Sequence, residues 1–431
     1  MTGPDFPTAA QAPPSATPQA AEQAGPGGVA LSAPDHYLHR PGAPARSGVL
    51  DLGLKCVHSC RFCYYSFFEG SQDQFAPLRK AGLRSTADCK EILRLFKEQG
   101  FKRFDVTGGE PTLHEDLAEI IRYAHDELGL SSRVITLGQL LGKPGKRCAK
   151  YLLDDLLDAG LSDFLFSLHA VDEAVFKDFT GASFERLRRV MSHLDREAIQ
   201  YGANTVVFRG STPMLEDVAR FSSDHGVFQH NFILFNAYHA WSGSAKAAGV
   251  QESYRAIEPR LSRAVEILTR AGVAVNIRYA PLCAFPDLRR HVVGVMGQQF
   301  DPYEWRNRAC NPDREPAYCA QAVELPPDGV RPPHVYVPLD ETLENGVRLI
   351  GRRGESFTVF AGPCAECAAR TACDGLNRGY LELYGDGELR PFASLETRGP
   401  LLQDRLDYAR AFVVKLGQKA DMRGLVRTVS A

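Results

Sequence analysis

Residues 47–63, SGVLDLGLKCVHSCRFC, decide the fold and point to the chemistry. The apolar run at the start predicts a strand, and Cys56, Cys60 and Cys63 follow it in a loop with the spacing C-x3-C-x2-C. Thiolates this close can converge on one metal centre, and thiolates select zinc or iron–sulfur clusters. A structural zinc site usually has four ligands. Three from one loop therefore indicate either a fourth ligand elsewhere, such as His58 in a zinc knuckle, or an iron left open to a small molecule.

Beyond this stretch, strand-like and helix-like segments alternate as far as residue 281. Six or seven β-then-α repeats in about 235 residues predict an α/β fold, with a parallel sheet curled into a barrel or partial barrel and helices outside. In such folds the reactive face lies at the carboxyl ends of the strands. The predicted strands are 47–54, 102–107, 132–138, 162–170, 204–210, 230–238 and 274–280, and the predicted helices are 86–100, 113–129, 149–160, 183–202, 215–226 and 254–272.

A second motif, TGGEP, stands at the carboxyl end of the second predicted strand, about 45 residues after the cysteine loop. Gly108 and Gly109 carry no side chains, so backbone there can approach a ligand and adopt unusual torsions. Glu110 offers one carboxylate at the rim of the barrel. Taken alone, the motif could also be a plain turn between strand and helix with a surface glutamate.

Together, the cysteine loop and TGGEP resemble the radical SAM superfamily, whose signature is C-x3-C-x-aromatic-C after the first strand of a partial (β/α)6 barrel. The resemblance implies that the three cysteines hold a [4Fe–4S] cluster whose open iron is chelated by S-adenosylmethionine (SAM). It implies that Phe62 lies near the adenine and that Gly108, Gly109 and Glu110 bind the methionine amino group. The implied activity is reductive cleavage of SAM to a 5′-deoxyadenosyl radical, which abstracts a hydrogen from the substrate.

Members of this superfamily commonly place a polar residue at the end of the fourth strand, where it touches the ribose or carboxylate of SAM. Ser167 occupies that place here, with His169 beside it. At the ends of the fifth and sixth strands, Arg209 and Asn236 face the same way if the barrel forms. Arg209 is a candidate cofactor contact, although a salt bridge or a capping role fits these two residues about as well.

A second cysteine cluster, GPCAECAARTACDG, contains Cys364, Cys367 and Cys373 with the spacing C-x2-C-x5-C. It resembles the core of the SPASM/Twitch domains that bind auxiliary [4Fe–4S] clusters in many radical SAM enzymes, and a zinc ribbon is the alternative. The larger SPASM pattern has a further cysteine where this chain has Asn377, and no cysteine follows Cys373. We therefore expect one auxiliary cluster rather than two.

The fourth ligand of this auxiliary cluster is expected to be Cys283, directly after the last barrel strand. Cys310 and Cys319 compete for that place, and either could instead be a thiol that donates a hydrogen atom. Four protein ligands favour electron transfer, which suits dehydrogenation, epimerisation or cross-linking. Cys89 and Cys148 are expected to be ordinary thiols.

These motifs divide the chain into four parts. We expect a disordered Pro/Ala-rich tail over 1–45, a radical SAM barrel over 46–281, a SPASM/Twitch-like domain over 282–400, and a C-terminal helix and tail over 401–431. The tail is too poor in large apolar residues to offset its chain entropy by burial.

Charge and cysteine usage restrict the partners. With a net charge of −2, the chain lacks the positive electrostatic field that nucleic-acid binding usually needs. No signal peptide or membrane span is evident in the sequence. An odd count of 11 cysteines without a signal peptide indicates reduced thiols, and we expect a cytoplasmic protein. The expected partners are a small-molecule or peptide substrate and a reductant such as flavodoxin or ferredoxin. An RNA-modifying radical SAM enzyme and a non-enzymatic iron–sulfur or zinc protein are the alternatives.

Overall fold

The computed structural model describes most of the barrel and part of the C-terminal region. The described residues are 47–63, 82–98, 103–145, 151–236, 245–289, 291–293, 358–367, 373 and 375–393. The predicted helix over 402–417 and the cysteines Cys148, Cys310 and Cys319 lie outside them. No helix in the described part of the chain is long and apolar enough to cross a membrane.

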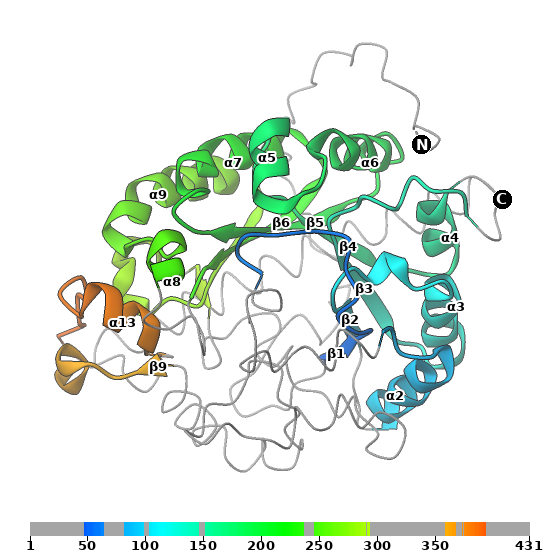
Figure 1. Ribbon diagram of the computed structural model, residues 1–431, viewed down its shortest axis with the longest axis horizontal. Coiled ribbons are helices and arrows are strands. Elements are labelled where there is room, and N and C mark those ends of the chain that lie inside the picture. Colours follow the sequence, from blue (N-terminus) through cyan, green and yellow to red (C-terminus); the bar gives the residue numbers. More distant parts are fainter. Residues whose placement is uncertain are drawn as a thin grey trace, which may run out of the picture.

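Eight parallel strands form one curved sheet in the order of the sequence, with helices along its outer side (Figure 1). Buried residues fill the strands, as expected for a parallel sheet covered on both faces. The strands are β1 (Ser47–Asp51), β2 (Arg103–Thr107), β3 (Ser131–Thr136), β4 (Asp163–Ser167), β5 (Tyr201–Val207), β6 (Val227–Leu234), β7 (Ala274–Arg278) and β8 (Val292–Val293). The α/β prediction is confirmed, and of the eight strands of this sheet the two-residue β8 was not predicted.

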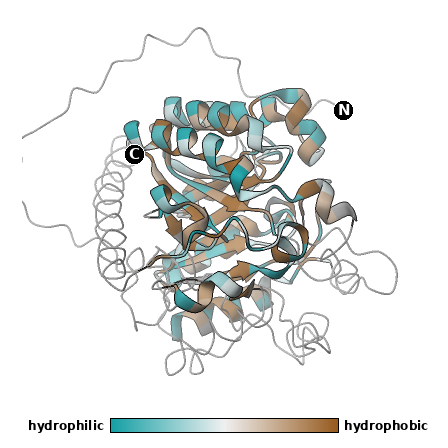
Figure 2. Cartoon of the chain, turned by 90° about the vertical axis from the view of Figure 1, so that its left-hand side faces the viewer, coloured by the Kyte–Doolittle hydropathy of each residue, from teal (hydrophilic) through white to brown (hydrophobic). Residues whose placement is uncertain are grey.

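The helices bury an apolar stripe against the sheet and expose their charged faces, and Figure 2 shows this as teal along the outer sides of several helices. In α6, for example, the hydroxyl of Ser183 caps the first turn, and the stripe includes Leu187, Val190 and Leu194. The helices around the sheet are α2 (Thr86–Glu98), α3 (Leu117–Arg122), α4 (Leu152–Asp158), α5 (Glu173–Thr180), α6 (Phe184–Arg196), α7 (Leu215–Asp224), α8 (Ala245–Val250) and α9 (Tyr254–Arg270).

Several predicted helices differ from the observed ones. The segment predicted as a helix over 113–129 begins with a 3-10 turn, forms α3 and ends in a π-helical turn over Tyr123–Glu127. Neither α5 nor α8 was predicted. Of these, α5 matters for the site, because its carboxyl end lies against the cysteine loop.

The sheet contains a buried ion pair in addition to its apolar core. Asp105 on β2 accepts hydrogen bonds from Nε and Nη2 of Arg133 on β3, both at 2.8 Å. Both side chains are almost fully buried. Burial alone would raise the pKa of Asp105, but Arg133 and Arg103 outweigh it and hold that pKa below its ordinary value.

The described C-terminal residues dock on α9. They include the short antiparallel pair β9 (Thr358–Val359) and β10 (Leu376–Asn377) and the helix α13 (Arg378–Tyr384). The rings of Tyr254 and Tyr380 stack with their centroids 3.9 Å apart, and the Tyr254 backbone N–H donates to the Tyr380 hydroxyl at 2.8 Å. Figure 1 shows α13 beside the α8 and α9 side of the barrel.

Candidate functional site

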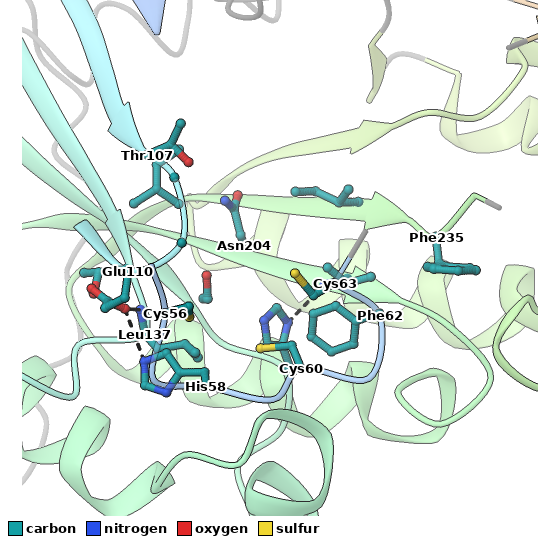
Figure 3. Close-up of a pocket in the computed structure, with 18 of the residues that line it drawn as sticks. Cys56, His58, Cys60, Phe62, Cys63, Thr107, Glu110, Leu137, Asn204 and Phe235 are labelled. Atoms are coloured by element: carbon teal, nitrogen blue, oxygen red, sulfur yellow. Dashed lines mark hydrogen bonds and ion pairs between the residues drawn. The ribbon is translucent and has the colours of Figure 1, made fainter. Parts of the chain in front are cut away.

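A cavity of about 560 Å³ opens at the carboxyl ends of the strands. The cysteine loop and TGGE line one side of it, and the ends of β3 to β7 line the rest. Figure 3 shows Cys56, Cys60 and Cys63 near Phe62 and Glu110 in this cavity. The structure thus brings the two predicted motifs together.

The cysteine loop is pinned from outside by α5. Backbone N–H groups of Ser59 and Arg61 donate to the carbonyls of Thr180 and Phe179, both at 2.9 Å. The chain leaves α5 at Gly181, which has a φ of 70°. Glycine is favoured there because L side chains rarely adopt this left-handed conformation, and a Cβ would also force the Ser59 hydroxyl to move.

The two glycines of TGGE contact the cysteine loop itself. A Cβ on Gly108 would lie 2.4 Å from the carbonyl oxygen of Gly53, and a Cβ on Gly109 would lie 2.2 Å from that of Lys55. This approach makes two hydrogen bonds, from Gly109 N to Gly53 O at 2.7 Å and from Glu110 N to Lys55 O at 2.9 Å. These glycines therefore allow the backbone of the cysteine loop to approach closely. From the sequence, we expected a ligand to be the group that approaches.

Glu110 is a buried anion whose oxygens are held by the protein. Its side chain is 2% exposed, and its Oε1 accepts hydrogen bonds from the hydroxyls of Thr112 at 2.5 Å and Thr136 at 2.6 Å. Burial raises the pKa of Glu110, but hydrogen bonds from His58, Thr112 and Thr136 outweigh it and lower the pKa below its ordinary value. The carboxylate is thus ionised at neutral pH and ties β2, β3 and the cysteine loop together.

His58 faces Glu110 rather than a cluster of thiols. Its Nε2 lies 3.3 Å from Glu110 Oε2, and its side chain is buried. Within the described residues no three His, Cys, Asp or Glu side chains converge closely enough to hold a single metal ion. The zinc-knuckle alternative, which needs ligands at about 2.0–2.3 Å from one ion, gains no support from this arrangement.

The thiols of Cys56, Cys60 and Cys63 lie in surroundings that favour binding of a positively charged metal centre. Burial, with smaller contributions from Glu110 and Cys63, raises the pKa of Cys56 to about 11. Burial likewise raises the pKa of Cys60, with Cys63 and Cys56 adding to the shift. Three thiolates beside a carboxylate are unfavourable unless a positive group binds among them, and iron of an iron–sulfur cluster supplies that charge. The donor set therefore fits the implied cluster.

Phe62, Ser167 and His169 all line the cavity, as the sequence placed them. The Phe62 ring packs edge-on against the His169 ring with centroids 4.5 Å apart. Burial, with a smaller effect of His230, lowers the pKa of His169 to about 3. The backbone N–H of Val206 donates to His169 Nδ1 at 3.2 Å, so neutral His169 carries its proton on Nε2.

Arg209 is not brought to the cavity. Its Nη2 donates to the Tyr384 hydroxyl at 3.0 Å and to the Gln251 carbonyl at 3.4 Å, which ties the end of β5 to α13. The predicted cofactor contact therefore gains no support, and these two contacts are not a salt bridge either, since both partners are uncharged. Asn236 does line the cavity and donates to the Tyr279 carbonyl at 2.9 Å.

The second cysteine cluster lies near Cys283. Cys283 is buried directly after β7, and its neighbour Leu282 donates its backbone N–H to Cys373 Sγ at 3.5 Å. Burial raises the pKa of Cys283 to about 11, and Cys364 and Cys367 are close enough to contribute to that rise. Cys89 is a buried core residue of α2. The expectations for Cys310 and Cys319 concern residues outside the described ranges.

Asn204 is one of the cavity residues that the sequence interpretation missed. Asn204, in the middle of β5, pairs with Ser167 of β4 and lines the cavity. The strand predicted from the sequence begins at this residue, whereas the observed strand begins at Tyr201 and places Asn204 at an interior position, where side chains are normally apolar.

Comparisons with known proteins bear on the segment that holds both motifs. Residues 51–222 match the radical SAM superfamily. The chain is 30% identical over 190 residues to a "Probable GTP 3′,8-cyclase" of Sulfolobus acidocaldarius, covering 42% of this chain and 55% of that protein. It is 29% identical over 173 residues to a GTP 3′,8-cyclase of Staphylococcus saprophyticus, covering 39% and 48%. The chain thus spans about half the length of these curated relatives.

Among solved structures, SuiB of Streptococcus suis bound to S-adenosylmethionine has a similar fold. The TM-score is 0.51 at 14% sequence identity, over 80% of this chain and 77% of that one. SuiB bound to the precursor peptide SuiA also gives 0.51, at 16% identity. At these identities the likeness concerns the fold.

Proposed function

We propose that this chain, which carries a radical SAM domain over residues 51–222, is an enzyme that cleaves S-adenosylmethionine reductively and abstracts a hydrogen from its substrate. One observation carries the proposal. The cysteine loop and TGGE, about 45 residues apart in sequence, form one hydrogen-bonded rim of a cavity at the carboxyl ends of the strands.

The residues of this rim have separable roles. Cys56, Cys60 and Cys63 would hold the SAM-binding [4Fe–4S] cluster, and Gly108 to Glu110 would bind the amino group of SAM. When bound, cluster and SAM together supply a carbon-centred radical. Glu110 remains ionised and keeps the loop docked through its contacts with β3. Ser167 and Phe62 line the wall against which SAM would be oriented.

An auxiliary [4Fe–4S] cluster held by Cys283, Cys364, Cys367 and Cys373 belongs to the same proposal. The nearness of Cys373 to Leu282 and of Cys364 and Cys367 to Cys283 supports it. With four protein ligands, such a cluster would pass an electron to or from the substrate. Dehydrogenation, epimerisation or cross-linking of a small molecule or peptide would then follow, in an oxidoreductase or maturase of SPASM/Twitch type.

We infer that the reductant is a small electron carrier such as flavodoxin or ferredoxin and that the enzyme works in the cytoplasm. A second candidate is cyclisation of a purine nucleotide, because the curated relatives carry that name at about 30% identity. The RNA-modifying alternative stays the weaker one, since the net charge is −2.

Anaerobic reconstitution followed by an iron count and a dithionite-driven SAM cleavage assay tests the activity. We expect 5′-deoxyadenosine from the wild type and none from Cys56→Ala. Cys89→Ala, which removes a buried thiol away from the cavity, is the matched control and keeps the activity. The proposal fails if the wild type forms no 5′-deoxyadenosine or if Cys56→Ala forms it at the wild-type rate.

The auxiliary cluster has a test of its own. Cys283→Ala is expected to lose about half of the iron, since one of two four-iron clusters loses a ligand. Retention of the full iron content by this variant would rule out Cys283 as a ligand.

A further inference from the structure

Three asparagines form a ladder across the sheet below the cavity. Asn204 of β5, Asn231 of β6 and Asn276 of β7 are direct partners in the strand register. Asn276 Nδ2 donates to Asn231 Oδ1 at 2.8 Å, and Asn231 Nδ2 donates to Asn204 Oδ1 at 2.8 Å. Gln229 Nε2 also donates to Asn231 Oδ1, at 2.7 Å. All four side chains are buried.

Such a ladder is unusual where apolar side chains normally fill a barrel. Buried amides cost free energy unless they are hydrogen-bonded, and here the amides of Asn276 and Asn231 both donate toward β5. Hydrogen bonds in a chain polarise one another, so the last amide becomes a stronger donor. That last group is Asn204 Nδ2.

Asn204 presents this donor to the cavity. The residue is 8% exposed and lines the cavity, and its Nδ2 has no hydrogen-bond partner in the described part of the chain. In Figure 3 it lies between Thr107 and Cys63. Its strand partner is Ser167, the predicted SAM contact, and neighbouring strands are about 4.8 Å apart. A group bound to Asn204 would therefore lie beside bound SAM.

The charges around the cavity restrict what that group can be. Lys55 is the one lysine or arginine among the described residues that line it, and Glu110 adds a buried negative charge. Phosphate recognition normally uses several arginines or lysines. An uncharged acceptor suits this wall better than a triphosphate does.

We propose that Asn204 is a substrate-binding residue whose Nδ2 donates to a carbonyl oxygen of an uncharged, amide-type substrate. The inference rests on the proposed function, since it places the substrate beside SAM. It deepens that function by favouring a peptide over a nucleotide.

The test uses the reconstituted, SAM-loaded protein and two probes, the neutral peptide acetyl-trialanine amide and GTP. Saturation-transfer NMR titrations give the affinity of each probe, and equilibrium dialysis gives that of SAM. Asn204→Asp keeps the acceptor oxygen that Asn231 needs but removes the donor. We expect it to bind the peptide about tenfold more weakly, the factor for one lost hydrogen bond beside a new negative charge. SAM affinity should stay within about twofold by the same scale.

Asn377→Asp is the matched control for the added charge, because an aspartate can still cap α13, and it should bind the peptide as the wild type does. Three results would overturn the proposal. They are a wild type that does not bind the peptide, an Asn204→Asp variant that binds it equally well, and a loss confined to SAM. Failure of the proposed function is seen separately, as absence of 5′-deoxyadenosine from the wild type.

Discussion

Replacing Gly109 by alanine tests whether the cysteine loop and TGGE act as one unit. The added Cβ would lie 2.2 Å from Lys55 O, 2.6 Å from Lys55 C and 2.8 Å from Leu54 C. All three are backbone atoms, so no flexible side chain can move aside. The φ of Gly109 is not in the left-handed region, so the effect comes from the close approach alone.

The magnitude follows from the contacts that must yield. To admit the Cβ, the loop has to move away and stretch the bonds from Gly109 N to Gly53 O and from Glu110 N to Lys55 O. Each bond contributes about 0.5–1.5 kcal/mol net, and overpacking against fixed atoms costs about 1–3 kcal/mol. The docked loop is therefore destabilised by about 2–6 kcal/mol. At 1.4 kcal/mol per tenfold, SAM affinity should fall at least about 30-fold.

Equilibrium dialysis of SAM against the reconstituted variant measures this effect, and circular dichroism checks that the barrel still folds. Gly249→Ala is the matched control, because this glycine is exposed in α8 and a Cβ there meets nothing within 4 Å. Its SAM affinity should equal that of the wild type. If Gly109→Ala binds SAM within about threefold of the wild type, the two motifs are not mechanically coupled in this way.

Two further predictions concern stability. Asp105→Asn should lower the free energy of unfolding, measured in urea, by about 3–5 kcal/mol, because Arg133 stays buried without its anion. Asp217→Asn is the control. Asp217 pairs with Arg220 on the surface, so this substitution should leave the free energy of unfolding nearly unchanged. Since the folded pKa of Asp105 is lowered, its stabilisation is present above the unfolded pKa of about 3.9 and is lost as the pH falls through the folded value. Burial lowers the pKa of His169 and of His230 to about 3, so both stay neutral in the folded protein, and unfolding titrations should show stability falling below about pH 6.5. Each histidine contributes up to about 1.4 kcal/mol per pH unit to the slope of unfolding free energy against pH. His230→Asn should reduce that slope by about half. An unchanged slope would contradict the burial argument.

The barrel could be predicted because its signals are local and repeated. Each strand is a short apolar run, and each long helix carries an apolar stripe over at least ten residues, as in 254–272, observed as Tyr254–Arg270. The cysteine loop and TGGE could also be placed, because both directly follow strands. A rule of the fold, that parallel strands end at one edge, then brings them together.

What could not be predicted depends on contacts distant in sequence. The eight residues of α5 bury only Phe176, Phe179 and Thr180, too few to give a clear helical period, yet this helix pins the cysteine loop. Arg209 stands at a strand end like the site residues, but its side chain turns to Tyr384, a partner 175 residues away. The spacing of residues within a strand cannot predict a partner so far away in the sequence.

The glycines of TGGE show how a correct motif can carry an incomplete physical reason. Glycine at a strand end permits close approach, and from sequence a ligand is the natural thing to approach. In the structure the approaching groups are the backbone carbonyls of Gly53 and Lys55, and Lys55 directly precedes Cys56. The same strand end that would bind SAM thus fixes the loop that would hold its cluster, and Glu110 continues this tie to β3 through Thr136. Because a displacement at one motif moves the other, substitutions at Gly108 or Gly109 should reduce cluster retention and SAM affinity together, whereas substitutions at Ser167 should reduce SAM affinity alone.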